Sequence, residues 1–481
     1  MSREFGEMAL SEAERAGASY VDVRIGEILD ESLTVKNGVP EEVNLLQTKG
    51  FGVRAMVKGS WGFAASVDLT KAEVTRVAHQ AVSIAKASAR LQKNPALLTK
   101  TPPSQTEYST PMKVNPLNVG LEEKMEALIA AQKTVAAQSA LIKVSQAFYR
   151  AKQEKKLFLS TEGSEIHQQI NWCGGGIMAL AIKNGEVQRR SYPSSFRGNF
   201  GTSGYEFFEA LDLQGNAKQV GNEAMQLLSA KKCPSRSTDL IIAGDQLALQ
   251  IHESCGHPTE LDRALGMEAD YAGTSFLTPD KLGTFRYGSE QVNIVADATV
   301  PRGLGTFGFD DEGVPAKKIY LVKEGLFIGY QSSRETSHTL KIESSGGMRA
   351  DSPMAIPLIR MTNINLLPGS WTAEEIIDDT KNGILMQTNR SWSIDDLRLN
   401  FQFGTEIGWH IKNGSVEEMV KNPTYTGITP EFWGSCDAIS RDDWMMWGTP
   451  NCGKGVPGQV MYVGHGCGTT RMKGVRVGLI D

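Results

Sequence analysis

The sequence predicts an α+β protein in two parts, an N-terminal α/β domain over residues 1–235 and a β-rich C-terminal domain over residues 236–481. Three observations lead to this fold class. The chain has 481 residues, enough for two or three domains. Helical and strand periodicities alternate through its first half. Beyond about residue 290, short strand-like runs are separated by glycine turns, which is typical of an antiparallel, barrel-like domain.

The first 235 residues are expected to repeat a helix–strands–helix order. In the first copy, the apolar residues of segment 2–16 share one helical face. Strands follow around the turn signal Asn37-Gly38, and an amphipathic helix over 68–91 begins at an Asp/Thr cap. A proline-rich crossing segment over 94–116 separates this copy from the next.

The second copy has the same order without detectable identity to the first. Its elements are a helix near 120–138, strands across 142–190 and a helix near 216–230. Residues 240–243, "LIIA", then form a short buried strand that leads into a further helix. Turns are expected at Asn382-Gly383 and Asn413-Gly414 in the C-terminal domain.

Composition excludes several classes of protein. The net charge is −5 and no basic tract occurs, so direct nucleic-acid binding is not expected. No apolar run approaches the roughly 20 residues that cross a bilayer, and the N-terminus does not resemble a signal peptide. Six cysteines in this length do not form a disulfide framework, and a reducing cytoplasm fits best.

The stretch "IHESCGHPTE" carries the strongest chemical signal. His252, Glu253 and His257 resemble a zinc-protease motif with one extra residue between the glutamate and the second histidine. Helix positions four apart lie about 40° from each other and can share a metal, whereas positions five apart lie about 140° from each other and cannot. The alternative is a pair of ordinary helix histidines without a metal.

The flanking residues resolve this conflict if the helix is deformed. A π-type turn over Ser254–Gly256 would return both rings to one face. Gly256 loosens the backbone, and Pro258 is expected to end the helix and push His257 out of the α region. Cys255, between the histidines, would then face away from the metal as a small buried residue.

A catalytic zinc needs three protein ligands and one open position, and a neighbouring glutamate accepts a proton from the water that the metal activates. Spacing alone leaves the third ligand open among Glu260, Asp262, Cys452, His465 and Cys467. A donor for the developing oxyanion is also needed. The candidates by residue type are Tyr330, Arg334, Arg360, Arg349 and His465, of which His465 is favoured.

Two further segments carry motif-like patterns. "GLGTFG", over 303–308, satisfies a dinucleotide-binding pattern, but Gly313 and Pro315 prevent the helix that such a site requires, so it is expected to be a loop. Asp310–Glu312 could bind a cation, line the catalytic cleft or form a solvated acidic turn.

The chain as a whole resembles the TldD/PmbA family, also called modulator of DNA gyrase, and its TldD-type metalloproteases in particular. Five segments in this order carry the resemblance: "GFGVRAMVKGSWGFAA", "HESCGHPTELDRALG", "GLGTFGFDDEGVPAKKIYLVKEGLFIGY", "RMTNINLLPG" and "CGKGVPGQ". The resemblance implies Zn²⁺ bound by His252, His257 and Cys452, with Glu253 as general base. It also implies a homodimer, or a heterodimer with a PmbA/TldE-type chain.

Two functions follow as expectations. The first is zinc-dependent hydrolysis of short, unfolded or leader peptides, with His465 and Arg349 at the substrate or oxyanion. The alternative is a regulatory or binding subunit of a TldD/TldE-like complex with a structural metal. A structural zinc is closed by four protein ligands, for which Cys467 or His465 would be available, whereas a catalytic zinc keeps a position for water.

Overall fold

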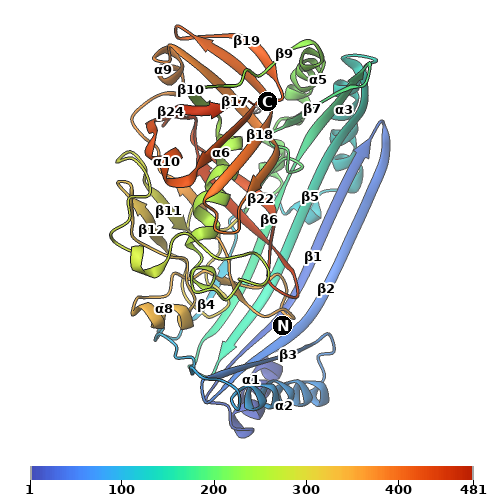
Figure 1. The fold of residues 1–481 in the computed structure, drawn as a ribbon. Helices are drawn as coiled ribbons and strands as arrows, with labels where there is room; N and C mark the ends of the chain where they lie inside the picture. The colour runs from blue at the N-terminus through green and yellow to red at the C-terminus, as the bar shows by residue number, and fades with distance from the viewer. Residues whose placement is uncertain (1–2, 479–481) are drawn as a thin grey trace.

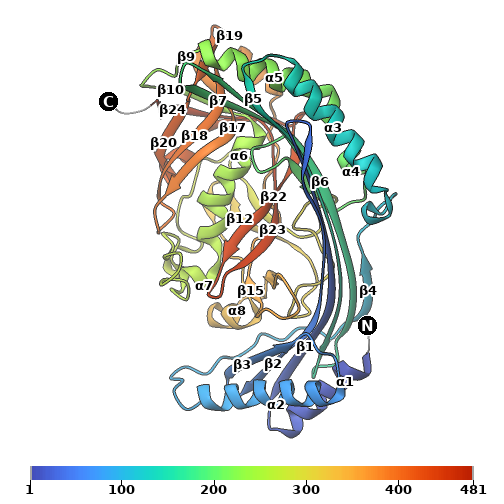
Figure 2. The same cartoon turned by 90° about the vertical axis from the view of Figure 1, so that its right-hand side faces the viewer.

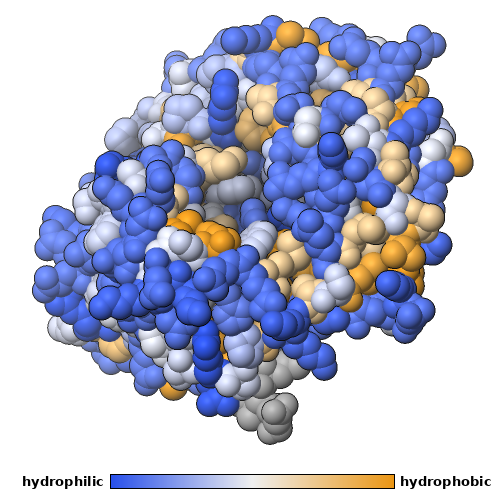
Figure 3. Space-filling model, turned by 90° about the horizontal axis from the view of Figure 1, so that it is seen from above, coloured by the Kyte–Doolittle hydropathy of each residue, from blue (hydrophilic) through white to orange (hydrophobic). Residues whose placement is uncertain are grey.

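The computed structural model describes residues 3–478. Its N-terminal part is one long, curved sheet with helices on its outer side, and its C-terminal part lies in the concavity of that sheet (Figures 1 and 2). No helix in the described range is long and apolar enough to cross a membrane. Seen from above, the surface is hollowed near its centre, and hydrophobic residues lie within the hollow (Figure 3).

The helix–strands–helix order occurs twice, but both sets of strands join a single eight-stranded sheet. The first set is α1 (Arg3–Arg15), β1 (Tyr20–Lys36), β2 (Val39–Val57), β3 (Ser60–Ser66) and α2 (Lys71–Ser88). The second is β4 (Gln105–Ser109), α3 (Leu121–Ala137), β5 (Ile142–Ser160), β6 (Glu165–Lys183), β7 (Glu186–Tyr192), β8 (Asn199–Gly201), α4 (Glu206–Glu209) and α5 (Leu213–Ser229). The strand order is β3-β2-β1-β5-β6-β4, and β7 and β8 also pair with β6.

Two separate cores hold the helices on this sheet. Ala9 of α1 and Val77 of α2 pack against Val23 and Val53 at one end. Leu128 of α3 packs with the helix α5 and strands β5 and β6 towards the other end. Because β1, β2, β5 and β6 are each 17 or 19 residues long, they reach past both cores and leave their inner face free for the C-terminal part.

The C-terminal part is built on a closed five-stranded barrel, as the sequence predicts. Its strands are β17 (Asn382–Ile394), β10 (Arg236–Ile242), β24 (Thr470–Val477), β20 (Thr424–Ile428) and β18 (Asn400–Lys412), and β17 closes the ring by pairing with β18. The β10–β17 pairing is parallel, so the barrel is not wholly antiparallel. The turn expected at Asn382-Gly383 is wrong, because both residues begin β17, whereas Asn413-Gly414 does join two strands.

The remaining elements surround the barrel. The strands are β9 (Lys231–Lys232), β11 (Ile294–Asp297), β12 (Lys318–Lys323), β13 (Leu326–Phe327), β14 (Met348–Arg349), β15 (Leu358–Ile359), β16 (Ile364–Leu366), β19 (Ser415–Lys421), β21 (Cys436–Ile439), β22 (Met445–Lys454) and β23 (Gln459–Cys467). The helices are α6 (Gly244–Ile251), α7 (Leu261–Ala264), α8 (Arg334–Leu340), α9 (Ala373–Asp378) and α10 (Thr429–Gly434). Helix α6 follows β10 directly, and all of its residues are buried.

Candidate metal centre

The motif lies at the end of α6, where the helix changes its hydrogen-bonding pattern. Residues His252–Gly256 form a π-helical turn, and the N–H of His257 donates to the carbonyl of His252, five residues earlier. The prediction of a π turn is confirmed. It places the two histidine rings with their centroids 4.8 Å apart, although a regular helix would point them to different faces.

Neighbouring side chains satisfy the carbonyls that the wider turn releases. Tyr287 Oη donates to the Ser254 carbonyl at 2.9 Å, and Gln331 Nε2 donates to the Gly256 carbonyl at 2.8 Å. Trp433 Nε1 donates to the Ser254 hydroxyl at 2.9 Å. A buried backbone group without a hydrogen-bond partner destabilises the folded state. These contacts supply such partners, so the irregular turn is tolerated inside the core.

The expected effect of Pro258 is wrong in one respect. His257 stays in the α region, with φ −63° and ψ −45°, and the chain becomes extended only at Glu260. Pro258 lies at the start of a short 3₁₀ turn, His257–Thr259, where a missing N–H costs no helical bond. The restriction that proline places on its predecessor is a preference, and here the π turn overrides it.

A third candidate metal ligand lies beside the two histidines, on the hairpin of β22 and β23. One donor atom each of His252, His257 and Cys452 lie within 4.8 Å of one another, and Cys452 Sγ is 3.9 Å from His257 Nε2. The pairing of β22 with β23 shifts register between Thr449 and Cys452. Such an irregularity redirects side chains, as is common beside functional sites.

The Nδ1 atom of each histidine contacts a neighbouring side chain. His257 Nδ1 lies 3.0 Å from Glu260 Oε2, and His252 Nδ1 lies 2.9 Å from His465 Nε2. These contacts fix the orientation of both rings. They leave Nε2 of each ring as the nitrogen available to bind a metal. Lys454 in turn lies 3.4 Å from the Glu260 carboxylate.

The protonation states of the donors suit a metal. Burial lowers the pKa of His252, which favours the neutral imidazole. Burial alone would raise the pKa of the Cys452 thiol, but Arg360 and His257 hold that pKa below its ordinary value and favour the thiolate. Two imidazoles and a thiolate are a donor set that fits zinc. Within residues 3–478 the group offers three candidate ligand atoms, one fewer than the four that close a structural zinc site.

Glu253 lies beside the donors, at the start of the π turn. Burial would raise its pKa, but the histidines and Arg398 keep the pKa of this carboxyl below its ordinary range. Arg398 Nη1 donates directly to Glu253 Oε2. The sequence gives no local sign of this partner, because Arg398 lies 145 residues away in the loop between β17 and β18.

The other candidate residues have different surroundings. His465 is fully buried, and its contact is with His252 rather than with a cavity. Arg349 donates to the carbonyls of Tyr462, at 3.0 Å, and Met361. Cys467 Sγ lies 3.2 Å from the Gly244 carbonyl, and neither it nor the buried Cys255 belongs to the three-donor group. The substrate or oxyanion roles of His465 and Arg349 stay predictions.

The acidic segment Asp310–Glu312 is buried and connects the two parts of the molecule. Asp311 Oδ1 lies 2.7 Å from Lys156 Nζ of β5, and Glu312 lies 3.2 Å from Arg54 of β2. The interpretation as a solvated acidic turn is therefore wrong. Asp311 also lines a narrow cavity together with Arg349.

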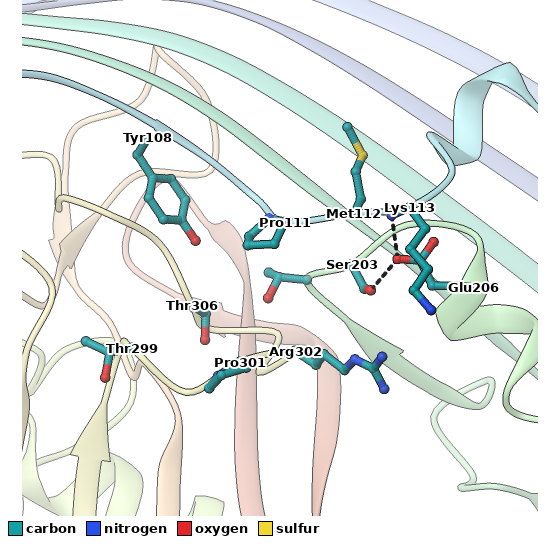
Figure 4. Close-up of a pocket in the computed structure, with 11 residues that line it drawn as sticks. Tyr108, Pro111, Met112, Lys113, Ser203, Glu206, Thr299, Pro301, Arg302 and Thr306 are labelled. Atoms are coloured by element: carbon teal, nitrogen blue, oxygen red, sulfur yellow. Dashed lines mark hydrogen bonds between the residues drawn. The ribbon is translucent and has the colours of Figure 1, made fainter.

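The loop 303–308 is not followed by a helix, as predicted, and it borders a separate cavity of about 490 Å³. Figure 4 shows Tyr108 and Pro111 on one side of this cavity and Thr306 and Pro301 on the other. None of the three donors lines it. Glu206 at its edge accepts N–H groups of Lys113 and Val114, at 2.9 and 3.1 Å, so this carboxylate is already satisfied.

Comparison with known proteins identifies relatives along most of the chain. Sequence profiles of the PmbA/TldA metallopeptidases match residues 21–85 (domain 1), 114–231 (central domain) and 235–479 (C-terminal domain). The chain belongs to the PmbA/TldD family. A metalloprotease of Methanocaldococcus jannaschii is 31% identical over 453 residues, covering 94% of this chain and 95% of the relative. A metalloprotease TldD homolog of Haemophilus influenzae is 26% identical, covering 95% and 92%.

Solved structures of the family share the fold. TldE from Thermococcus kodakarensis superposes with a TM-score of 0.75 at 16% identity, covering 99% of this chain and 100% of that one. A Thermotoga maritima protein described as a candidate modulator of a DNA gyrase superposes with a TM-score of 0.77 at 17% identity, covering 99% of both. Among sequence relatives, a Saccharolobus solfataricus protein is named a zinc metalloprotease TldD homolog, at 23% identity over 98% of both chains.

Proposed function

We propose that this chain is a zinc-dependent metallopeptidase of TldD type that hydrolyses short, unfolded or leader peptides in the cytoplasm. The observation that carries the proposal is the buried group of His252, His257 and Cys452 with Glu253 beside it. The names of the relatives, one of which includes zinc, support it. Residues 1–235 would form the supporting domain and residues 236–481 the catalytic one.

The chemistry divides between the metal and the residues of the chain. Zinc in such a site polarises a carbonyl and lowers the pKa of water from about 15.7 to about 7. Glu253, held ionised, accepts the proton of the attacking water and delivers it to the nitrogen of the departing amine. His465 and Glu260 keep the two imidazoles oriented through their Nδ1 atoms.

Burial of the donors favours flexible peptides as substrates. His252, His257 and Cys452 are 4%, 8% and 4% exposed, so a scissile bond inside a folded domain would not reach them. All six cysteines are free, which agrees with a reducing cytoplasm.

A partner chain, either a second copy or a PmbA/TldE-type protein, is part of the proposal. The similarity to TldE supports it. The N-terminal half of β2 also supports a partner, because its side chains Val39, Val43, Leu45 and Leu46 are at least half exposed. An exposed strand with apolar side chains is typical of a surface that another chain covers.

The alternative, a regulatory subunit with a structural metal, requires a fourth protein ligand. The two residues that could supply one have other contacts, His465 with His252 and Cys467 with the Gly244 carbonyl. An open position and an adjacent carboxylate favour catalysis over a structural role.

Three variants test the proposal. Glu253→Gln should keep one zinc per chain and lose peptidase activity by at least about 100-fold, because only the proton acceptor is removed. Cys452→Ala should lose zinc and activity together, whereas Cys255→Ala, an equally buried cysteine outside the donor group, should retain both. Zinc content and hydrolysis of unstructured peptides are measured for each. Full zinc and activity in Cys452→Ala would contradict the assignment.

A further inference from the structure

The guanidinium of Arg398 is the one cation that contacts the carboxylate of Glu253 within residues 3–478. Both side chains are largely buried, 16% and 8% exposed. The contact uses only Nη1 of the guanidinium: Nε is buried without a partner, and Nη2 makes no hydrogen bond in the described part of the chain. Arg398 therefore holds Glu253 and still has free donors beside it.

The loop over residues 395–399 fixes Arg398 in this position. The Asp395 carboxylate accepts the N–H groups of Leu399 and Asn400 at 2.7 and 3.1 Å. The Arg398 carbonyl accepts the Thr429 hydroxyl at 3.0 Å, and Arg263 donates to the Asp396 carbonyl at 2.9 Å.

Arg398 itself has a φ of +66°, a left-handed conformation that few residues other than glycine adopt. Residues in such conformations persist where the surroundings determine them, and they cluster at functional sites. The loop thus presents one particular side chain to Glu253 at a conformational cost.

Arg349 and Arg360, also close to the metal-binding group, have both terminal nitrogens engaged, although Nε of each is buried without a partner, as it is in Arg398. Arg349 donates to the carbonyls of Tyr462 and Met361. Arg360 donates to the carbonyls of Cys452 and Gln459. Arg398 differs from both in two ways. Its Nη1 contacts the proposed general base, and its Nη2 is not used in a hydrogen bond within the described residues.

We propose that Arg398 is a catalytic residue that stabilises the negative charge on the scissile carbonyl oxygen. The inference rests on the proposed peptidase function. As the water oxygen bonds to the carbonyl carbon, the π pair moves onto the carbonyl oxygen and the water proton passes to Glu253. The proton then goes to the leaving nitrogen as the C–N bond breaks. The free Nη2 group of Arg398 donates to the charged oxygen, and Nη1 keeps the carboxylate aligned.

The test compares Arg398→Met and Arg398→Lys with wild type and with Arg390→Met. Arg390 is a matched control on the same hairpin, because its contacts are with Gln188 and Asn422 rather than with Glu253. The zinc-loaded proteins are assayed for kcat and KM on an unstructured peptide, for zinc content and for thermal stability.

Arg398→Met should lower kcat by about 100-fold or more while KM changes less than about threefold, with one zinc retained. Arg398→Lys keeps the charge but loses the planar fork, so its kcat should fall by at least about tenfold. Arg390→Met should resemble wild type. If Arg398→Met does not fold, the lysine variant decides the matter.

Three results would overturn the inference: kcat within about threefold of wild type in both Arg398 variants, a rise in KM alone, or loss of zinc together with activity. A rise in KM alone would assign Arg398 to ground-state binding. Wild-type protein that binds zinc but cleaves no peptide would instead refute the proposed function, and the role of Arg398 with it.

Discussion

Glu260 offers a sharp test of how the second histidine is held. Its Oε2 lies 3.0 Å from His257 Nδ1, and the carboxyl is 1% exposed. Burial would raise its pKa, but Lys454 and His257 hold the pKa well below its ordinary value, so the group is a carboxylate. A hydrogen bond to a buried charged group contributes roughly 1.5–3 kcal/mol, against about 1 kcal/mol for a neutral one.

Glu260→Gln keeps an oxygen that accepts from His257 but removes the charge, a loss of about 1.4 kcal/mol that corresponds to about tenfold weaker zinc binding. Glu260→Ala removes the contact altogether and should weaken binding by up to about 100-fold. Zinc dissociation constants come from competition with a chromophoric chelator.

Asp262→Asn is the matched control. Asp262 also contacts Lys454, at 2.9 Å, but the His257 ring is held by Glu260. Its substitution should change zinc affinity by less than about threefold. Glu260 does not hold the His257 ring for the metal if Glu260→Ala binds zinc as tightly as wild type, or if Asp262→Asn binds zinc as weakly as Glu260→Gln.

Two further predictions concern stability, measured by urea unfolding. Asp311→Asn leaves Lys156 and Arg24 without their buried counter-charge and should cost about 3 kcal/mol. Burial would raise the Asp311 pKa, but Lys156 and Arg24 lower it below 3.8, so this difference should be full above pH 3.8 and shrink at lower pH. A difference below about 1 kcal/mol would refute this. Gly256→Ala puts Cβ 2.3 Å from Met361 Sδ and should cost about 1–3 kcal/mol. The loss of unfolding free energy caused by Gly256→Ala should largely vanish when Met361 is also replaced by alanine. If the two substitutions instead destabilise the protein by the sum of their separate effects, the clash with Met361 is not the cause.

The sequence predicted the fold class and the π turn because both depend on local pattern. Alternation and helical periodicity identify strands and helices. The five-residue spacing of His252 and His257 demands a deformed helix. The merging of both strand sets into one sheet, and the parallel β10–β17 pairing, depend on contacts between distant segments that no local pattern records.

The residues of the candidate site also differ in how far the local sequence identifies them. His252, Glu253 and His257 could be found from one stretch, whereas Cys452 needed the family resemblance. Arg398 was missed because it meets Glu253 only when the β17–β18 loop reaches the end of α6. Proline's effect on His257 was overestimated, since a propensity is weaker than the hydrogen bonds of the surrounding core.

We expect His252, His257 and Cys452 to bind zinc and to leave one coordination position open. X-ray absorption at the zinc edge of wild-type protein and Cys452→Ala measures this directly. We expect wild type to show one sulfur at about 2.3 Å and two imidazole nitrogens at about 2.0–2.1 Å, with one further light atom. The sulfur should be absent from any zinc that Cys452→Ala retains. Two sulfurs in wild type, or a sulfur that persists in Cys452→Ala, would contradict this ligand set.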